Sequence, residues 1–229
     1  MHPKEKLLQS LKNKLVVSCQ ALPDEPLYGS ILMRTMAEAA MRGGASGIRA
    51  NSVDDITEIM GHVPLPVIGI IKKIVPGSQV YITPTRSEVD ALAKIGVPII
   101  AMDATSRERP DKIPLSDSFP AIRKTYPDIL FMADCATYED GLRARELGFD
   151  IVGTTLCGYT EETKGTELPH YELIEQLVKN LSVPVAAEGG IWTPEHMKKA
   201  FYAGAHFCVV GTAITRPMHI TRRFVEELP

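Results

Sequence analysis

The sequence predicts an α/β protein, a single (β/α)8 TIM barrel that spans residues 1–229. Eight short apolar runs alternate with amphipathic segments, a pattern typical of repeated βαβ units. The runs are continuously apolar rather than alternating, as expected for parallel strands buried on both faces. The polar or glycine residues that end the runs recur about every 27 residues between Gln20 and Gly211, and a barrel of roughly 200–250 residues requires such spacing.

The eight runs are short and rich in β-branched residues, which favours strands over helices. In chain order the expected strands are Leu15–Ser18, Gly47–Arg49, Val67–Ile71, Ile99–Met102, Leu130–Ala133, Ile151–Gly153, Val185–Ala187 and Cys208–Val210.

The segments between the runs carry helix start and stop signals. Ser52 is a candidate N-cap, as is Thr193, which Pro194 follows at the first helical position. Single glycines recur shortly before strands and indicate helix ends. The expected helices are Ser30–Arg42, Ser52–Met60, Glu88–Lys94, Ser118–Lys124, Tyr138–Leu147, Tyr171–Lys179, Pro194–Tyr202 and Ile220–Leu228, and the glycine stops are Gly96, Gly148 and Gly204.

A doubly wound open sheet is the alternative fold. It would normally need fewer strands at this length and often a glycine-rich first turn. The sequence contains no G-x-G-x-x-G and no Walker A motif, so a nucleotide-binding function is disfavoured.

Composition and charge narrow the function further. The chain is 45% hydrophobic and 23% charged with a net charge of −3, so it has no strong electrostatic attraction for nucleic acid or an anionic membrane. Cys19, Cys135, Cys157 and Cys208 form no C-x-x-C pair, and we expect structural thiols. The basic N-terminus lacks the apolar core of a signal peptide, so we expect a cytoplasmic protein.

Polar side chains at the ends of the strands form the candidate site. In a barrel of this kind the active site lies at the carboxyl ends of the strands. Charged groups that converge there cost several kcal/mol unless they are paired, so their presence indicates function. Six residues qualify: Gln20, Arg49, Lys72, Asp103, Asp134 and Glu188.

The last two strand ends are rich in glycine and read Glu188-Gly189-Gly190 and Val210-Gly211-Thr212. Glycine lets backbone N–H groups approach an anion closely, and this position commonly holds a phosphate in barrels. The alternative is that these glycines are ordinary turn residues.

Lys72 is the candidate base. A lysine has an ordinary pKa of about 10.4, and partial burial or nearby cations such as Arg49 would lower it. A neutral amine could then abstract a carbon-bound proton next to a carbonyl, or form a Schiff base. Glu188 or Asp134 could move protons between oxygens. Adjacent strand residues point to opposite faces, so we expect Lys73 to be the solvated lysine.

An ordered set of short segments resembles the N-acetylmannosamine-6-phosphate 2-epimerases of bacterial sialic-acid catabolism. The resemblance extends from about Leu15 to Phe224. The segments are Ser18-Cys19-Gln20-Ala21, Gly47-Ile48-Arg49-Ala50-Asn51, Gly69-Ile70-Ile71-Lys72-Lys73, Tyr81-Ile82-Thr83-Pro84-Thr85, Asp103-Ala104-Thr105, Met132-Ala133-Asp134-Cys135, Gly153-Thr154-Thr155, Gly158-Tyr159-Thr160, Ala187-Glu188-Gly189 and Gly211-Thr212-Ala213-Ile214-Thr215-Arg216-Pro217.

This resemblance implies a barrel that interconverts N-acetylmannosamine 6-phosphate and N-acetylglucosamine 6-phosphate without a cofactor. The histidines form no H-x-H or H-E-x-x-H pattern, so we expect no metal site. The implied catalytic residues are Lys72 and Glu188. The implied sugar contacts are Gln20, Arg49, Asp134 and Arg216, and the phosphate contacts are Gly189, Gly190, Gly211 and Thr212. We expect a homodimer that binds a phosphorylated amino sugar. A Schiff-base aldolase and a non-catalytic sugar-phosphate-binding protein are the alternatives on the same barrel.

Overall fold

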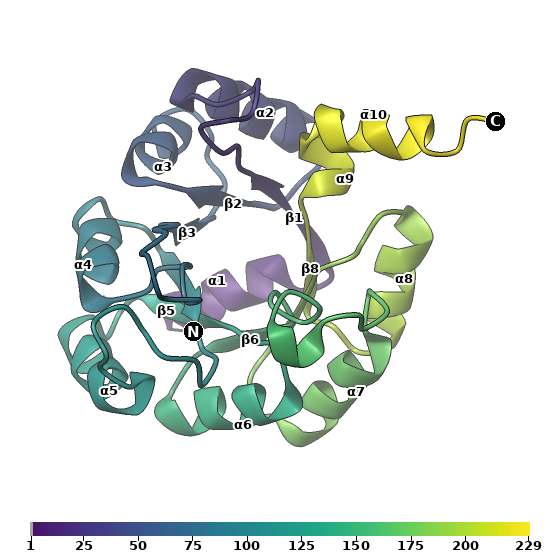
Figure 1. Cartoon of the computed structure of the whole chain (residues 1–229). Helices are drawn as coiled ribbons and strands as arrows, with labels where there is room; N and C mark the ends of the chain where they lie inside the picture. Colours follow the sequence, from purple (N-terminus) through teal and green to yellow (C-terminus); the bar gives the residue numbers. More distant parts are fainter. Residues whose placement is uncertain (1) are drawn as a thin grey trace.

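The computed structural model describes residues 2–229 and forms a closed barrel of eight parallel strands. The strands follow one another around the ring in chain order, and β8 pairs with β1 to close it (Figure 1). All eight expected strands are confirmed, with small changes at their ends. They are β1 (Lys14–Cys19), β2 (Gly47–Asn51), β3 (Val67–Ile70), β4 (Ile99–Asp103), β5 (Leu130–Asp134), β6 (Ile151–Gly153), β7 (Val185–Glu188) and β8 (Phe207–Val210).

Helices surround the ring (Figure 1). Three of them, α2 (Ser30–Arg42), α6 (Tyr138–Leu147) and α8 (Pro194–Tyr202), have the bounds that the sequence predicts. Their termini carry the expected signals, since Thr137 and Thr193 accept N-cap hydrogen bonds and Gly148 ends α6 in the left-handed conformation. The others are α3 (Val53–Met60), α4 (Arg86–Lys94), α5 (Leu115–Thr125), η1 (Glu161–Thr163), α7 (Tyr171–Asn180) and α9 (Thr212–Thr215).

The two ends of the chain differ from the sequence prediction. An additional helix, α1 (Pro3–Leu11), begins at a capping box formed by His2 and Glu5, with Pro3 at its first position. The last helix, α10, covers Pro217–Val225, so the expected range of 220–228 is wrong. It begins earlier because Pro217 is pre-organised for the first helical turn, a signal that the apolar pattern alone does not reveal.

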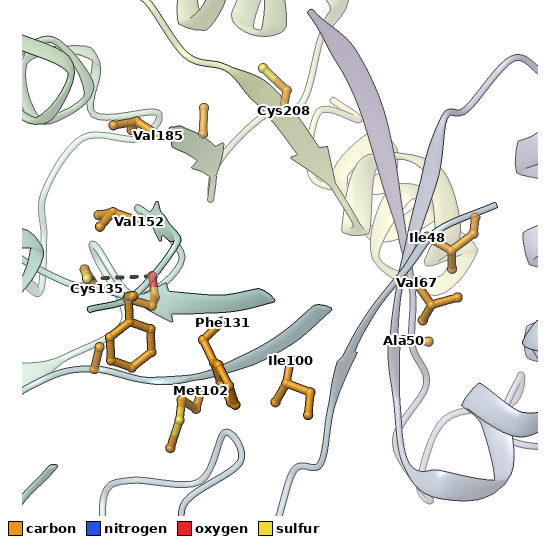
Figure 2. Close-up of a cluster of buried hydrophobic side chains, with 14 of the residues drawn as sticks. Ile48, Ala50, Val67, Ile100, Met102, Phe131, Cys135, Val152, Val185 and Cys208 are labelled. Atoms are coloured by element: carbon orange, nitrogen blue, oxygen red, sulfur yellow. Dashed lines mark hydrogen bonds between the residues drawn. The ribbon is translucent and has the colours of Figure 1, made fainter. Parts of the chain in front are cut away.

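Two hydrophobic clusters stabilise the barrel, because successive strand residues point alternately inward and outward. The inner cluster fills the barrel, and Leu11 of α1 is buried in it. The outer cluster lies between the strands and the helices (Figure 2). On β5, for example, Leu130 and Met132 belong to the inner cluster, whereas Phe131 belongs to the outer one.

All four cysteines are free, buried members of the outer cluster, as expected for structural thiols. Among residues 2–229, no helix combines the length and the apolar content that a membrane crossing requires.

The same alternation decides which charged side chains point into the barrel and which point toward solvent. Arg49 pairs in register with Ile68 of the inner cluster, and Asp134 follows Met132 by two residues, so both are buried in the barrel. Lys72 follows Ile70 by two residues and lines the cavity described below, whereas the side chain of Lys73 is 54% exposed. The expectation that Lys73 is the solvated lysine is therefore confirmed.

Candidate active site

A cavity of about 290 Å³ opens at the carboxyl ends of the strands. Most of the residues predicted for the site line it: Gln20, Arg49, Lys72, Glu188, Gly189, Gly190, Gly211, Thr212 and Arg216. Asp134 is fully buried and reaches the cavity only through its partners, which are Arg49 and Thr155.

Arg49 and Asp134 form a buried ion pair across the barrel. Their side chains are 1% and 0% exposed. Two guanidinium nitrogens of Arg49 donate to the two carboxylate oxygens of Asp134, Nη1 to Oδ1 at 3.0 Å and Nη2 to Oδ2 at 2.6 Å. This two-pronged contact fixes the plane of the guanidinium and neutralises both charges. One edge of the same guanidinium remains directed at Glu188.

Glu188 ends β7, and its carboxylate lies between a cation and a hydroxyl. Its Oε2 is 3.2 Å from Nη1 of Arg49 and 3.1 Å from Oγ1 of Thr155. The pKa of Glu188 is raised to about 7, mainly by burial; Arg49 opposes the shift, and the charge of Asp134 contributes to it. A carboxyl with such a pKa can hold or release a proton near neutral pH.

Lys72 lies just beyond β3, where an antiparallel bridge with Ile82 holds its backbone. Asn51 supports it as well, since Oδ1 of Asn51 accepts a 2.7 Å hydrogen bond from the Lys72 amide. The pKa of Lys72 is lowered to about 8, mainly by burial and also by the charges of Arg49 and Arg216. Among the described residues, Nζ of Lys72 has no hydrogen-bond or ion-pair partner. The amine is therefore free to act on a ligand.

Gln20 and Arg216 line the cavity near the first and last strands. Nε2 of Gln20 donates to Oγ of Ser18 at 2.7 Å, while Oε1 of Gln20 is buried with no partner in the part of the chain described here. Such an acceptor suits a ligand hydroxyl or amide. Arg216 donates through Nε to Oε2 of Glu25 at 3.0 Å and through Nη2 to the other oxygen. Glu25 thus holds the guanidinium at the rim of the cavity.

The glycines at the ends of β7 and β8 do not all have the same role. Gly189 and Gly190 adopt positive φ values of 108° and 69°, and a Cβ on Gly190 would collide with Leu168. Gly211 has an ordinary φ of −109° and a Cβ there would contact Ser18. Gly190 is therefore required for packing against Leu168, whatever its backbone N–H contacts.

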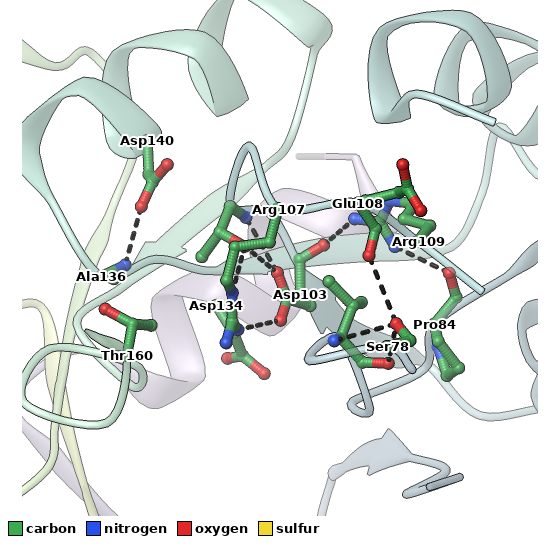
Figure 3. A network of polar contacts seen from close by, with 12 residues as sticks. Ser78, Pro84, Asp103, Arg107, Glu108, Arg109, Asp134, Ala136, Asp140 and Thr160 are labelled. Carbon is green, nitrogen blue, oxygen red and sulfur yellow. Dashed lines mark hydrogen bonds and ion pairs between the residues drawn. The ribbon is translucent and has the colours of Figure 1, made fainter. Parts of the chain in front are cut away.

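Asp103 does not reach the cavity, although its position at the end of β4 suggested that it would. Its Oδ2 accepts a 2.6 Å hydrogen bond from Nη2 of Arg107, and its Oδ1 accepts from the backbone and hydroxyl of Thr105 (Figure 3). Arg109 donates to the Asp103 carbonyl and to that of Pro84. This network braces the loops beside β4, so Asp103 has a structural role.

Polar residues that the sequence did not single out for a role also line the cavity, among them Glu25, Tyr81, Thr155 and Tyr159. Thr155 carries a signal that could have found it, because it continues the inward phase of Ile151 along the period of two. The other three lie on loops, where no periodicity predicts direction. Within residues 2–229, no group of three or more His, Cys, Asp and Glu side chains is placed to hold a metal ion.

Comparisons with known proteins identify the family to which the chain belongs. Residues 33–229 match a family model described as "Putative N-acetylmannosamine-6-phosphate epimerase". A protein of Caldanaerobacter subterraneus is 52% identical over 96% of this chain and 92% of its own length, and one of Shouchella clausii is 53% identical over 97% and 98%. Both are named "Putative N-acetylmannosamine-6-phosphate 2-epimerase".

Solved structures show the same likeness. The N-acetylmannosamine-6-phosphate 2-epimerase of Clostridium perfringens superposes with a TM-score of 0.93 at 50% identity, covering 97% of this chain and 96% of its own. A thiamine phosphate pyrophosphorylase of Pyrococcus furiosus gives a TM-score of 0.60 at 16% identity, which shows a shared barrel fold alone.

Proposed function

The chain belongs to the N-acetylmannosamine-6-phosphate epimerase family, and from this membership we propose that it interconverts N-acetylmannosamine 6-phosphate and N-acetylglucosamine 6-phosphate. The observation that carries the proposal is a single cavity lined by an amine of lowered pKa and a carboxyl of raised pKa. Such a pair suits the transfer of a proton from and to carbon near neutral pH.

The substrate binds with its sugar among Gln20, Arg49 and Arg216 in this proposal. The unpaired Oε1 of Gln20 accepts from a sugar hydroxyl or from the acetamido N–H, and Asp134 holds Arg49 in place from below. The phosphate binds to the backbone N–H groups at the ends of β7 and β8, where glycine leaves the backbone accessible. The residues concerned are Gly189, Gly190, Gly211 and Thr212.

The reaction begins when the sugar ring opens to its aldehyde, which makes the C2 hydrogen acidic. The neutral amine of Lys72 takes this hydrogen as a proton, and the electron pair of the C–H bond passes into the enolate of the aldehyde. Arg49 stabilises the negative oxygen of that intermediate. A proton from Glu188 then reaches the opposite face of C2, which inverts the carbon and leaves Lys72 as an ammonium and Glu188 as a carboxylate.

The order of strands supports this division of labour. β3 and β7, which lead to Lys72 and Glu188, are four strands apart in a ring of eight and therefore lie on opposite sides of the cavity. Two groups on opposite sides can address opposite faces of one carbon. Every step moves a proton and leaves the oxidation state of the sugar unchanged overall, so the proposed reaction needs no cofactor.

Proton NMR in deuterated water tests the function. With N-acetylmannosamine 6-phosphate, a metal chelator and no added cofactor, we expect formation of N-acetylglucosamine 6-phosphate that carries deuterium at C2. The label is expected because the proton that returns comes from a group that exchanges with solvent. Binding without turnover would support a sugar-phosphate-binding protein instead, and cleavage of a carbon–carbon bond would support an aldolase.

We also propose that the protein is a homodimer in which α10 packs against the partner. In the part of the chain described, no residue of α10 is buried, and Phe224 is 74% exposed. The helix projects away from the barrel (Figure 1), and the guanidinium of Arg223 lies 4.6 Å from the ring centroid of Trp192. An amphipathic helix with an uncovered apolar face indicates a protein contact.

Light scattering after gel filtration tests the dimer. We expect the wild-type protein at twice the mass of one chain, and Phe224→Asp combined with Val225→Asp at the mass of a single chain, because the charges prevent burial of the helix face. Glu226→Gln at the C-cap of the same helix is the control and should remain dimeric. A wild-type protein that elutes as a monomer at micromolar concentration would contradict the proposal.

A further inference from the structure

One hydroxyl group lies between the two acidic side chains of the site. Oγ1 of Thr155 is 2.7 Å from Oδ1 of Asp134 and 3.1 Å from Oε2 of Glu188. Both distances are within hydrogen-bonding range. The two acids come from β5 and β7, and Thr155 follows β6 between them. The hydroxyl therefore bridges two carboxyl groups that lie on either side of it.

The number of hydrogens available decides whether both contacts of Oγ1 can be hydrogen bonds. A threonine hydroxyl has one hydrogen to donate, and an ionised carboxylate has none. If Asp134 and Glu188 were both ionised, one of the two contacts would bring two oxygens together without a hydrogen between them. Both contacts become hydrogen bonds only when one of the acids is protonated and donates to Oγ1.

The surroundings decide which acid carries the proton. Asp134 accepts two hydrogen bonds from Arg49, which favours its ionised form, and its contact with Thr155 is the shorter one. Glu188 lies within ion-pair distance of Arg49 but makes no hydrogen bond with it among residues 2–229. One arrangement gives each contact its own hydrogen. The Glu188 carboxylic acid donates a hydrogen bond to Oγ1 of Thr155, and the Thr155 hydroxyl donates one to Asp134.

We propose that Thr155 is a positioning residue that holds Glu188 in its protonated form by accepting a hydrogen bond from the acid while donating one to Asp134. The inference deepens the proposed function, because the proton so held is the one that Glu188 delivers to C2. Thr155 does not need to touch the substrate for this role. A hydroxyl that instead donated to Glu188 would favour the ionised carboxylate.

In the described part of the chain, the other groups near Glu188 do not hydrogen-bond to its carboxyl as Thr155 does. The adjacent Thr154 fixes the backbone of Glu188, since its hydroxyl accepts from the Glu188 amide at 3.1 Å and donates to the Glu188 carbonyl at 2.9 Å. The titratable and charged groups that face the Glu188 side chain are Arg49 from β2, Lys72 after β3, Asp134 from β5 and Tyr159 from the loop after β6. The two cations favour ionisation of Glu188, whereas its burial and the charge of Asp134 favour the protonated form.

The test is a carbon-13 NMR titration of the Glu188 carboxyl in substrate-free protein, with the resonance assigned from Glu188→Gln. Thr155→Val removes the hydroxyl and keeps the shape, and Thr155→Ser keeps the hydroxyl. We expect the valine variant to lower the pKa of Glu188 by about one pH unit, the effect of a single hydrogen bond, and the serine variant to match the wild type. At pH 8, kcat should fall roughly tenfold in the valine variant with little change in KM, in proportion to the protonated fraction of Glu188.

Other outcomes would overturn the inference. A higher pKa of Glu188 in Thr155→Val would mean that the hydroxyl donates to Glu188, and an unchanged pKa would mean that the contact is structural only. If circular dichroism shows that Thr155→Val is unfolded, Thr155→Ala takes its place with the same expectation. The titration needs no substrate, so a failure of the proposed function would appear as absent epimerisation in the wild type, separately from the behaviour of Thr155.

Discussion

Replacing Lys72 with alanine is expected to abolish epimerisation together with the exchange of the C2 hydrogen with solvent. The variant lacks the amine that takes the proton, and loss of a positioned base costs roughly a hundredfold to ten-thousandfold in rate. Lys72 is suited to this role because its pKa of about 8 leaves about a tenth of the amine neutral at pH 7. The measurement is proton NMR in deuterated water, in which conversion and C2 deuteration are followed in the same sample.

Lys73 provides a matched control for this variant. It is the next residue in the chain, its side chain is largely exposed, and its Nζ lies 2.8 Å from Oε1 of Glu88. Lys73→Gln keeps a hydrogen-bond donor for Glu88, and we expect it to retain near-normal turnover. A Lys72→Ala protein with near-normal exchange would exclude Lys72 as the base. Trapping of a substrate adduct on Lys72 by borohydride would point to Schiff-base chemistry instead.

The second large effect is expected for Arg49→Met, which should lose both stability and activity. The change removes the cation that neutralises Asp134 and contacts Glu188, and breaking a buried ion pair from one side costs about 3–5 kcal/mol in free energy of unfolding. Turnover should fall by roughly two to three orders of magnitude, because the enolate loses its main hydrogen-bond donor. Urea unfolding and steady-state kinetics measure the two losses.

The stability loss should also depend on pH. Arg49 lowers the pKa of Glu188, so its removal raises a pKa that already stands well above that of an unfolded glutamate. When the pKa of a carboxyl is higher in the folded than in the unfolded state, the free energy of unfolding falls as the pH rises toward and through the folded-state pKa. We therefore expect the deficit of Arg49→Met to be greater at pH 8 than at pH 6.

Two further variants distinguish the buried pair from arginine loss in general. Arg34 pairs with Glu58 where both side chains are still partly exposed, and such contacts contribute about 1 kcal/mol or less, so Arg34→Met should cost far less than Arg49→Met. Adding Asp134→Asn to Arg49→Met removes the unpaired buried charge, and we expect part of the stability to return without the activity. Equal costs for Arg34→Met and Arg49→Met would contradict this account of the ion pair.

Much of the site could be predicted from the sequence, because the direction of a strand side chain and the end of a helix depend on residues close by in the chain. Continuous apolar runs mark the strands, and side chains along a strand alternate between its two faces, which correctly separates the cavity-lining Lys72 from the exposed Lys73. The same alternation indicates that Arg49 and Asp134 enter the barrel. Helix ends were equally predictable where caps and glycines mark them, as at Thr137 and Gly148.

The alternation of side chains along a strand does not predict which charged groups pair with one another, because those pairs join different strands and loops. Asp103 and Asp134 are opposite each other in register, yet Asp103 pairs with Arg107 on its own loop and Asp134 pairs with Arg49 from across the barrel. Their sequence context alone does not distinguish them, since each ends an apolar strand. The difference arises because only Asp103 has an arginine four residues ahead on a loop that folds back over it.

The amino-acid order by itself determined the eightfold alternation, the faces of the strands and the membership of a family of sugar-phosphate epimerases. The tertiary structure decided which charges meet: Glu188 beside Arg49, Thr155 between two acids, and Arg216 held by Glu25 from the other end of the chain. The physical reason is the distance along the sequence between the residues that interact. Strand phase and helix capping depend on neighbours a few residues away, whereas ion pairs and shifted pKa values depend on groups brought together by closure of the barrel.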